Sequence, residues 1–310
     1  MGAARTVTLY WNHICILHGH EQRHVRRAQE RLARRGIDLH AVFFGMGCEH
    51  RLSPYLARPD ARLPDVVVSA DLDMFDDARL FSSLGACHAC ASWMPRKDTP
   101  AVRAMERDPR LLPLVAIPIT CYGSASCEGL ALPDATRRFA TAFGGIDNAA
   151  ARTVVKAVWQ RYGEEEARSL LQRSSVTAMP IEAFHRARTG QADIALVPSV
   201  YALRADGTSR VHSRLAEGPI LLPTYFCARR GIDEETARAV LEEVMNEELL
   251  EFYARNGDLI AASADVRAES SQEHAARVLS YDQDFARGLE DRFYDAYCAR
   301  LPHAWRMPPR

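Results

Sequence analysis

The sequence has 310 residues, of which 47% are hydrophobic, so it holds enough apolar material for two packed lobes of about 150 residues each. Its formal net charge of -1 gives no electrostatic reason to expect a nucleic-acid partner. No apolar run approaches the roughly 20 residues that a membrane-spanning helix needs, so we expect no transmembrane segment.

Along the sequence, apolar runs that are typical of strands alternate with segments that have helical periodicity. Residues 6–10 and 37–44 are apolar runs that predict strands, and residues 21–35 between them predict a helix. Further along, residues 180–188 predict a helix that starts with a proline and ends before Gly190. Residues 194–197 then form a short apolar run, typical of a buried parallel strand. The alternation of strands and helices indicates an α/β fold.

The segment Thr189–Ser199, with its Gly-x-Ala-Asp turn, closely resembles the second lobe of type II periplasmic binding proteins, especially the ferric-ion branch of ABC-transporter substrate-binding proteins. The resemblance covers most of the chain. By it, the remaining elements are a third strand with its ligand loop (63–71), the helix that continues from it (72–80), a strand crossing between lobes (112–122), a second-lobe ligand loop with its helix (139–162) and a returning hinge strand (218–227).

The resemblance implies a two-lobe α/β fold with a hinge. Residues 1–115 and 220–310 are expected to form the first lobe, with the helices after residue 233 packing back on it, and residues 116–219 the second. Proteins of this family clamp a small ligand between two lobes. We therefore expect a solute-binding protein rather than an enzyme, with a metal ion, a metal complex or an oxyanion as ligand. An ABC-transporter permease or another partner protein would receive it.

Ligands of doubly wound sheets sit beyond the carboxyl ends of the strands and at helix N-termini. The loops that meet this description by resemblance follow the first, third and crossing strands, open the second-lobe helix and follow the strand at 194–197. The candidate ligand-binding residues are Asn12, His13, Ser69, Ala70, Cys121, Tyr122, Asp147, Asn148, Ala149, Ser199 and Tyr201.

Cysteines and histidines are unusually frequent for this family. The spacing Cys87-x-x-Cys90 lets two thiolates reach one metal, but a full tetrahedral shell needs further ligands from nearby loops. A thiol-ligated iron or zinc ion or an iron–sulfur cluster is one interpretation, and buried, small hydrophobic cysteines are the other. The candidate metal ligands are Cys15, Cys87, Cys90, Cys121, His13 and His88.

Two further patterns leave alternatives open. His20-Glu-Gln-Arg-His24 has the zincin spacing, but Arg27 and Arg31 share its helical stripe and oppose a dication, so we interpret the match as chance. The abundance of cysteine and histidine also resembles the pyrimidine synthases of thiamine biosynthesis. A cytoplasmic metal- or cluster-dependent enzyme on the same fold is therefore an alternative, as is a cofactor-holding sensor or chaperone.

The predicted first strand begins near Thr6, which leaves no room for a secretory leader. As given, the sequence therefore predicts a cytoplasmic protein, and a periplasmic one if a leader has been removed. Eight cysteines favour a reducing compartment.

Overall fold

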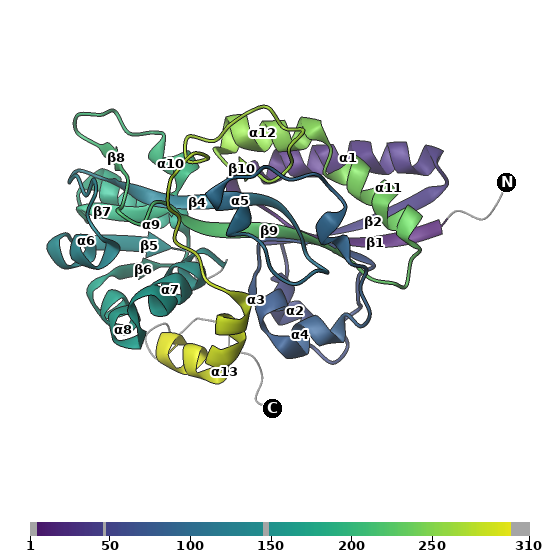
Figure 1. Ribbon diagram of the computed structural model, residues 1–310, viewed down its shortest axis with the longest axis horizontal. Coiled ribbons are helices and arrows are strands. Elements are labelled where there is room, and N and C mark those ends of the chain that lie inside the picture. The colour runs from purple at the N-terminus through teal and green to yellow at the C-terminus, as the bar shows by residue number, and fades with distance from the viewer. Residues whose placement is uncertain (1–4, 46–47, 145–148, 299–310) are drawn as a thin grey trace.

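The computed structural model describes residues 5–45, 48–144 and 149–298 and contains one mixed sheet (Figure 1). The main path of the sheet runs in the order β2-β1-β3-β9-β4-β7-β5-β6, and β8 and β10 add to β4. The strands are β1 (Arg5–Asn12), β2 (Ile37–Phe44), β3 (Val66–Ser69), β4 (Leu112–Gly123), β5 (Thr141–Gly144), β6 (Ser175–Thr177), β7 (Ile194–Pro198), β8 (Val211–Ser213), β9 (Ile220–Ala228) and β10 (Ile260–Ala261).

Two long antiparallel strands, β4 and β9, connect two parallel groups of three strands. The far end of β9 pairs with β3, which continues in parallel to β1 and β2. The far end of β4 pairs with β7, which continues in parallel to β5 and β6. We call the group β2-β1-β3 with its helices the first lobe and the group β7-β5-β6 with its helices the second lobe. The division at residues 115 and 220 stays a prediction.

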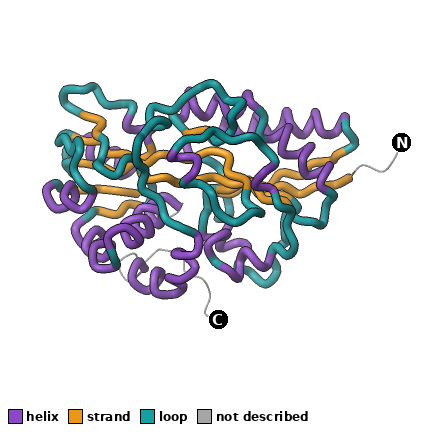
Figure 2. Tube along the Cα trace, in the orientation of Figure 1, coloured by secondary structure: helices purple, strands orange, loops and turns teal. Residues whose placement is uncertain are grey.

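Helices cover both faces of the sheet, as Figures 1 and 2 show. Each parallel group has the same strand order, with the first strand in the middle, and helices connect successive strands. The α-helices are α1 (His18–Arg34), α2 (Leu52–Leu56), α3 (Asp73–Asp76), α4 (Ala78–Ser83), α5 (Pro100–Arg103), α6 (Leu132–Arg138), α7 (Ala149–Tyr162), α8 (Glu164–Arg173), α9 (Pro180–Thr189), α10 (Ser199–Ala202), α11 (Glu234–Val244), α12 (Glu247–Gly257) and α13 (Gln283–Cys298).

The segment from α9 to β7 has the structure that its sequence predicts. Pro180 occupies the first turn of α9, where a missing N–H costs no hydrogen bond. Gly190 ends the helix with a positive φ of 79°, a conformation that glycine adopts without steric cost. Strand β7 follows at the side of the second-lobe group that adjoins the long strands, where it is buried between β4 and β5.

Two details differ from the sequence-based expectation. The helix predicted over residues 72–80 is two short helices, α3 and α4, because Asp77 is extended and its carboxylate accepts the N–H groups of Arg79 and Leu80 to begin a new helix. The last helix, α13, does not pack on the first lobe alone. It contacts α3 of the first lobe and α7 and α8 of the second, whereas α11 packs on α1 as expected.

Buried apolar side chains form one large cluster that runs through both lobes along the sheet. A smaller cluster packs α9 and α10 against the edge of β4 and includes Tyr122, Phe184 and Tyr201. Among the helices within the described ranges, none is both long and apolar enough to cross a membrane.

Candidate functional site

The strand ends of the two lobes meet at a small cavity beside the long strands. The first lobe contributes the loop after β1 and the residue after β3, and the second contributes the start of α7 and the end of β7 with the helix α10 that follows it. The cavity volume is about 50 Å³, far below the roughly 300 Å³ at which pockets for metabolite-sized ligands begin. The described lining residues are Asn12, His13, Ile14, Ile16, Leu17, Ala70, Ile117, Ala149, Ala150, Pro180, Pro198, Val200, Tyr201, Leu222 and Leu259.

His13 is the one histidine among these described lining residues, and a buried carboxylate orients it. The Nδ1 atom of His13 lies 2.8 Å from Glu21 Oε2, and the two side chains are 1% and 0% exposed. Since an ionised carboxylate only accepts, Nδ1 of His13 is the donor in this contact. Nε2 of His13 lies 3.4 Å from the side-chain amide nitrogen of Gln22. The ring of Phe43 stacks on the imidazole at 4.8 Å between centroids. The imidazole therefore has a fixed orientation.

The other oxygen of Glu21 accepts a hydrogen bond of 2.6 Å from Tyr253 on α12. The backbone N–H of Ile14 also donates to this carboxylate, at 3.2 and 3.3 Å. Burial and the adjacent Glu21 charge raise the pKa of Tyr253 well above its ordinary value, so its hydroxyl remains a donor. We call His13, Glu21 and Tyr253 the His13 cluster. Glu21 lies in α1, Tyr253 lies in α12, and His13 lies in the loop directly after β1.

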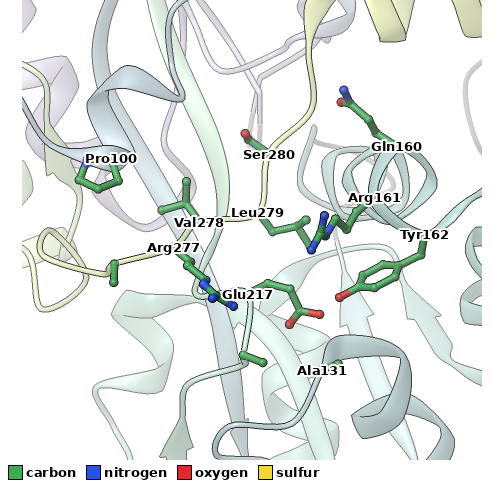
Figure 3. Close-up of a pocket in the computed structure, with 12 residues that line it drawn as sticks. Pro100, Ala131, Gln160, Arg161, Tyr162, Glu217, Arg277, Val278, Leu279 and Ser280 are labelled. Atoms are coloured by element: carbon green, nitrogen blue, oxygen red, sulfur yellow. The ribbon is translucent and has the colours of Figure 1, made fainter.

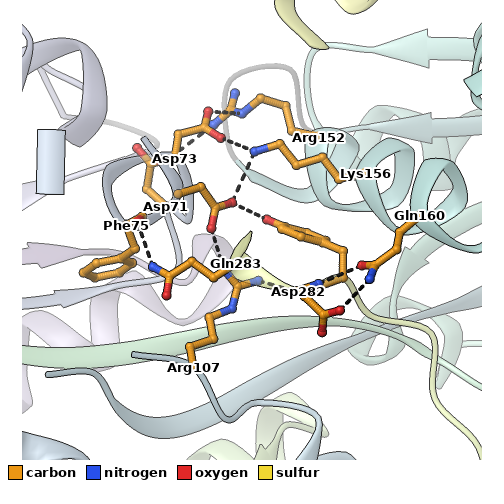
Figure 4. A network of polar contacts seen from close by, with 11 residues as sticks. Asp71, Asp73, Phe75, Arg107, Arg152, Lys156, Gln160, Asp282 and Gln283 are labelled. Atoms are coloured by element: carbon orange, nitrogen blue, oxygen red, sulfur yellow. Dashed lines mark hydrogen bonds and ion pairs between the residues drawn. The ribbon is translucent and has the colours of Figure 1, made fainter. Parts of the chain in front are cut away.

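A second group of buried polar side chains joins the two lobes (Figure 4). Three carboxylates of the segment after β3 face three cations from elsewhere in the chain. We call Asp71, Asp73, Asp76, Arg107, Arg152 and Lys156 the interlobe ion network.

The contacts across the lobes run from α7 to the segment at α3. Arg152 Nε lies 2.6 Å from Asp73 Oδ2, and Arg152 Nη2 lies 3.4 Å from Asp71 Oδ1. Lys156 Nζ lies 3.0 Å from Asp73 Oδ1 and 3.2 Å from Asp76 Oδ2. These side chains are at most 10% exposed, so water screens the attraction little. The formal charges of the network balance.

Two residues complete the network on the first-lobe side. Arg107 pairs with Asp76, and the hydroxyl of Tyr281 donates to the same carboxylate at 2.8 Å. Burial raises the pKa of Asp71, while the nearby Arg152 guanidinium opposes that shift. A buried carboxylate stays charged only beside such a cation, so the network depends on the lobes remaining together.

The structure brings five of the predicted ligand-binding residues to the cavity, and it places four others elsewhere. Asn12, His13, Ala70, Ala149 and Tyr201 line the cavity. Asp147 and Asn148 lie outside the described residues. The four placed elsewhere are Ser69, Cys121, Tyr122 and Ser199.

Each of the four displaced residues has another role in the fold. Ser69 Oγ accepts the N–H of Asp71 at 2.8 Å, and Ser199 Oγ donates to the carbonyl of Asp258 at 3.1 Å. Tyr122 packs on Phe184 with ring centroids 4.8 Å apart, in the smaller core cluster. The Sγ atom of Cys121 contacts that of Cys127.

The predicted thiol site is not one group in this structure. Cys121 lies in β4 beside the strands of the second lobe, whereas Cys87 lies next to Cys227 in β9, beside the first lobe. The pKa of Cys90 rises to about 12 because the thiol is buried. Nε2 of His88 lies 2.9 Å from the carbonyl of Ile232, and the side chain of Cys15 lies outside the described part of the chain. Among described residues, no three His, Cys, Asp or Glu side chains form a metal-binding group.

The zincin-like spacing is a packing feature. His20 stacks on Phe252 at 3.5 Å between ring centroids, His24 is buried, and Glu21 between them belongs to the His13 cluster. The histidine pair is therefore not free to share a metal ion.

A larger and more open pocket lies away from the strand ends (Figure 3). Its volume is about 710 Å³, and Arg161, Tyr162 and Arg277 are among its lining residues. Glu217 also lines it, but its carboxylate accepts the N–H of Leu132 at 3.0 Å and so holds the start of α6. The residues predicted to bind ligand do not include any of these.

Comparison with solved structures shows which fold this arrangement belongs to. The apo ferric ion-binding protein A of Pasteurella haemolytica superposes with a TM-score of 0.66 at 10% identity over 96% of this chain and 98% of that chain. Iron-bound HitA of Pseudomonas aeruginosa gives 0.67 at 16% identity over 96% and 99%. A periplasmic thiamin binding protein gives 0.67 at 13% identity over 96% of both chains. The chain has the type II periplasmic binding protein fold.

The resemblance seen in the sequence is thus confirmed at the level of the fold. No protein-family model and no curated protein sequence matches the chain. In the type II periplasmic binding protein fold, as in other doubly wound sheets, a ligand is expected where strand ends of the two lobes meet. The small cavity and the interlobe ion network both lie there.

The residues that the sequence reasoning missed are mainly charged. Asp71, Asp73 and Asp76 follow β3 directly, and Arg152 and Lys156 lie four residues apart on α7. The signal available in the sequence was the spacing of Arg152 and Lys156, because residues four apart lie on the same face of a helix.

Proposed function

We propose that this chain is a solute-binding protein that encloses a small ligand between its two lobes. The observation that carries the proposal is the interlobe ion network, which closes the lobes over a cavity lined by the strand ends of both. Its solved structural neighbours include proteins named for binding ferric ion and thiamin. A cavity of about 50 Å³ admits a ligand larger than a few waters only if the lobes first part.

The cavity favours a compact ligand with an apolar surface and one hydrogen-bond donor or metal centre. Most of its described wall is apolar, and Asn12, His13 and Tyr201 are the described lining residues with polar side chains. A histidine whose other nitrogen is held by a carboxylate is the usual arrangement for a metal ligand. We therefore infer that a metal complex, whose own ligands fill most of the metal's coordination sphere, fits better than a bare ion or an oxyanion.

By the same proposal a membrane permease of the ABC type receives the ligand. Opening of the lobes is then the step that releases it, and the interlobe ion network is the contact that must break. Because the network joins α7 to the segment at α3, these two segments must move apart for the lobes to open.

Lys156→Met tests this proposal by removing one cation while keeping a long side chain. In the closed form Asp73 and Asp76 would lose a buried counter-charge, so the lobes should part and admit water. Small-angle scattering should show a larger radius of gyration than the native chain. Affinity for any ligand that closes the lobes should fall roughly tenfold, equivalent to about 1.4 kcal/mol.

The matched control is Arg161→Met, an exposed cation on the same helix, which should leave scattering and affinity unchanged. The ligands to screen by melting temperature and scattering are ferric citrate, phosphate and thiamine. The proposal fails if none of them alters either quantity and Lys156→Met scatters as the native chain does.

A further inference from the structure

Cys121 and Cys127 form an isolated pair of thiols in the second lobe. Their sulfur atoms are 2.7 Å apart, closer than unbonded sulfurs normally approach, and both residues are fully buried. Cys121 lies near the end of β4, and Cys127 lies in the loop that follows this strand. The ring that a bond between them would close is short, running only from residue 121 to residue 127.

The surrounding backbone holds the two sulfurs together. Cys121 is opposite Leu196 of β7 and Ser213 of β8 in the sheet register. Ser213 Oγ accepts the N–H of Cys127 at 3.2 Å. At the next residue, the carboxylate of Glu128 accepts the N–H of Arg214 at 2.7 Å. The loop is thus hydrogen-bonded at Cys127 and Glu128 to the end of β8 and the residue after it, and the thiol has little freedom to leave its partner.

The two thiols differ in acidity. Hydrogen bonding to Cys121 lowers the pKa of Cys127, and Ser213 adds to the effect, although burial opposes it. The hydrogen bond to Cys127 and burial raise the pKa of Cys121. Cys127 therefore ionises first, and the thiolate is the form of cysteine that attacks disulfides.

We propose that Cys121 and Cys127 form an intramolecular disulfide that fastens the loop after β4 to the strand. The oxidant is a small disulfide such as oxidised glutathione. The Cys127 thiolate attacks one sulfur of the oxidant, forming a mixed disulfide and releasing one glutathione thiolate. Cys121 then loses its proton and attacks the Cys127 sulfur, which releases the second glutathione thiolate. Two protein thiols are oxidised and one small disulfide is reduced to two thiols.

Burial decides when the reaction takes place. Because both sulfurs are sealed from solvent, exchange requires the loop to open, as it does during folding. Once formed, the bond should resist a mild reductant in the folded chain and yield to it only under denaturing conditions.

The experiment refolds the full chain in a buffer of oxidised and reduced glutathione, alkylates free thiols in denaturant and digests with trypsin. Both cysteines fall in the one tryptic peptide 111–137, so the disulfide would leave this peptide unalkylated and lighter by two hydrogen atoms. Cys87 and Cys227 fall in the separate peptides 80–96 and 215–229, so oxidation there would be told apart. Melting of the oxidised chain should occur roughly 3 °C above that of the reduced chain.

Two variants keep the result interpretable. Cys127→Ser should leave one free thiol in peptide 111–137, which then carries one alkyl group, whereas Cys48→Ser should leave the peptide as in the native chain. A native peptide that carries two alkyl groups after refolding would overturn the proposal. So would one that carries glutathione on one cysteine and an alkyl group on the other, because the sulfurs would not then be held in reach.

Discussion

Two of the buried polar groups in the described part of the chain, the His13 cluster and the interlobe ion network, differ in what they connect. The His13 cluster joins the loop after β1 to α1 and α12, so the proposed opening of the lobes would leave its contacts in place. The network joins α7 to the segment at α3, so the proposed opening of the lobes would break its contacts. A change in the first should therefore cost folding stability, whereas a change in the second should shift the position of the lobes.

The largest effect is expected for Glu21→Ala. The substitution leaves His13 Nδ1, the Tyr253 hydroxyl and the N–H of Ile14 buried without their common acceptor. The free energy of unfolding should fall by about 3 kcal/mol, which urea unfolding followed by circular dichroism would measure. Glu21→Gln, which keeps an acceptor oxygen in the same place, should lose less. Native stability in the alanine variant would show that these contacts do not matter to the fold.

His24 gives a pH test of the same lobe. Burial, followed by the nearby Arg31 charge, lowers the pKa of His24 to about 4 from its ordinary value of 6.5. The unfolded chain therefore takes up the proton near pH 6.5 while the folded chain does not, so stability falls as the pH drops from about 6.5 to about 4. Between pH 7 and pH 5 the loss is about 2 kcal/mol.

Urea unfolding at both pH values measures this loss, and His24→Leu is the matched control because it removes the titrating group. The difference between pH 7 and pH 5 should be about 2 kcal/mol smaller in the variant than in the native chain. Equal differences in the two proteins would contradict the expectation that His24 is neutral when folded.

The difference between contacts within a segment and contacts between distant segments also explains which features the sequence could predict. Strands and helices follow from local patterns, and β1, β2, α9 and β7 lie within a few residues of their predicted positions. The turn at Gly190 follows from a single residue whose positive φ other residues avoid. The break between α3 and α4 at Asp77 also has a local cause. In the sequence, however, an aspartate that begins a helix within an apolar run cannot be told from an ordinary exposed aspartate.

The candidate site was predicted only in part, because its charged members come from distant segments. Lys156 and Asp73 are 83 residues apart, and each alone has the pattern of a solvated surface residue. The sequence also does not reveal which cysteines lie together. Cys87-x-x-Cys90 predicts a shared metal by its spacing, but the fold places Cys87 beside Cys227 and Cys121 beside Cys127. Loop positions were predicted by resemblance, whereas the direction of side chains such as Tyr122 depends on the strand register.

The smallest effect is expected one helical turn beyond Lys156, at Gln160, where a polar contact of α7 is exposed. Gln160 Nε2 donates to Asp282 Oδ2 at 2.5 Å, and Gln160 Oε1 accepts the N–H of Asp282 at 2.7 Å. Water can replace both partners, so Gln160→Ala should lower the free energy of unfolding by only about 0.5 kcal/mol and leave the scattering profile unchanged. Lys156→Met, at the buried end of the same helix face, should change the scattering. If Gln160→Ala opened the lobes as far as Lys156→Met does, the segment before α13 rather than the interlobe ion network would hold them together.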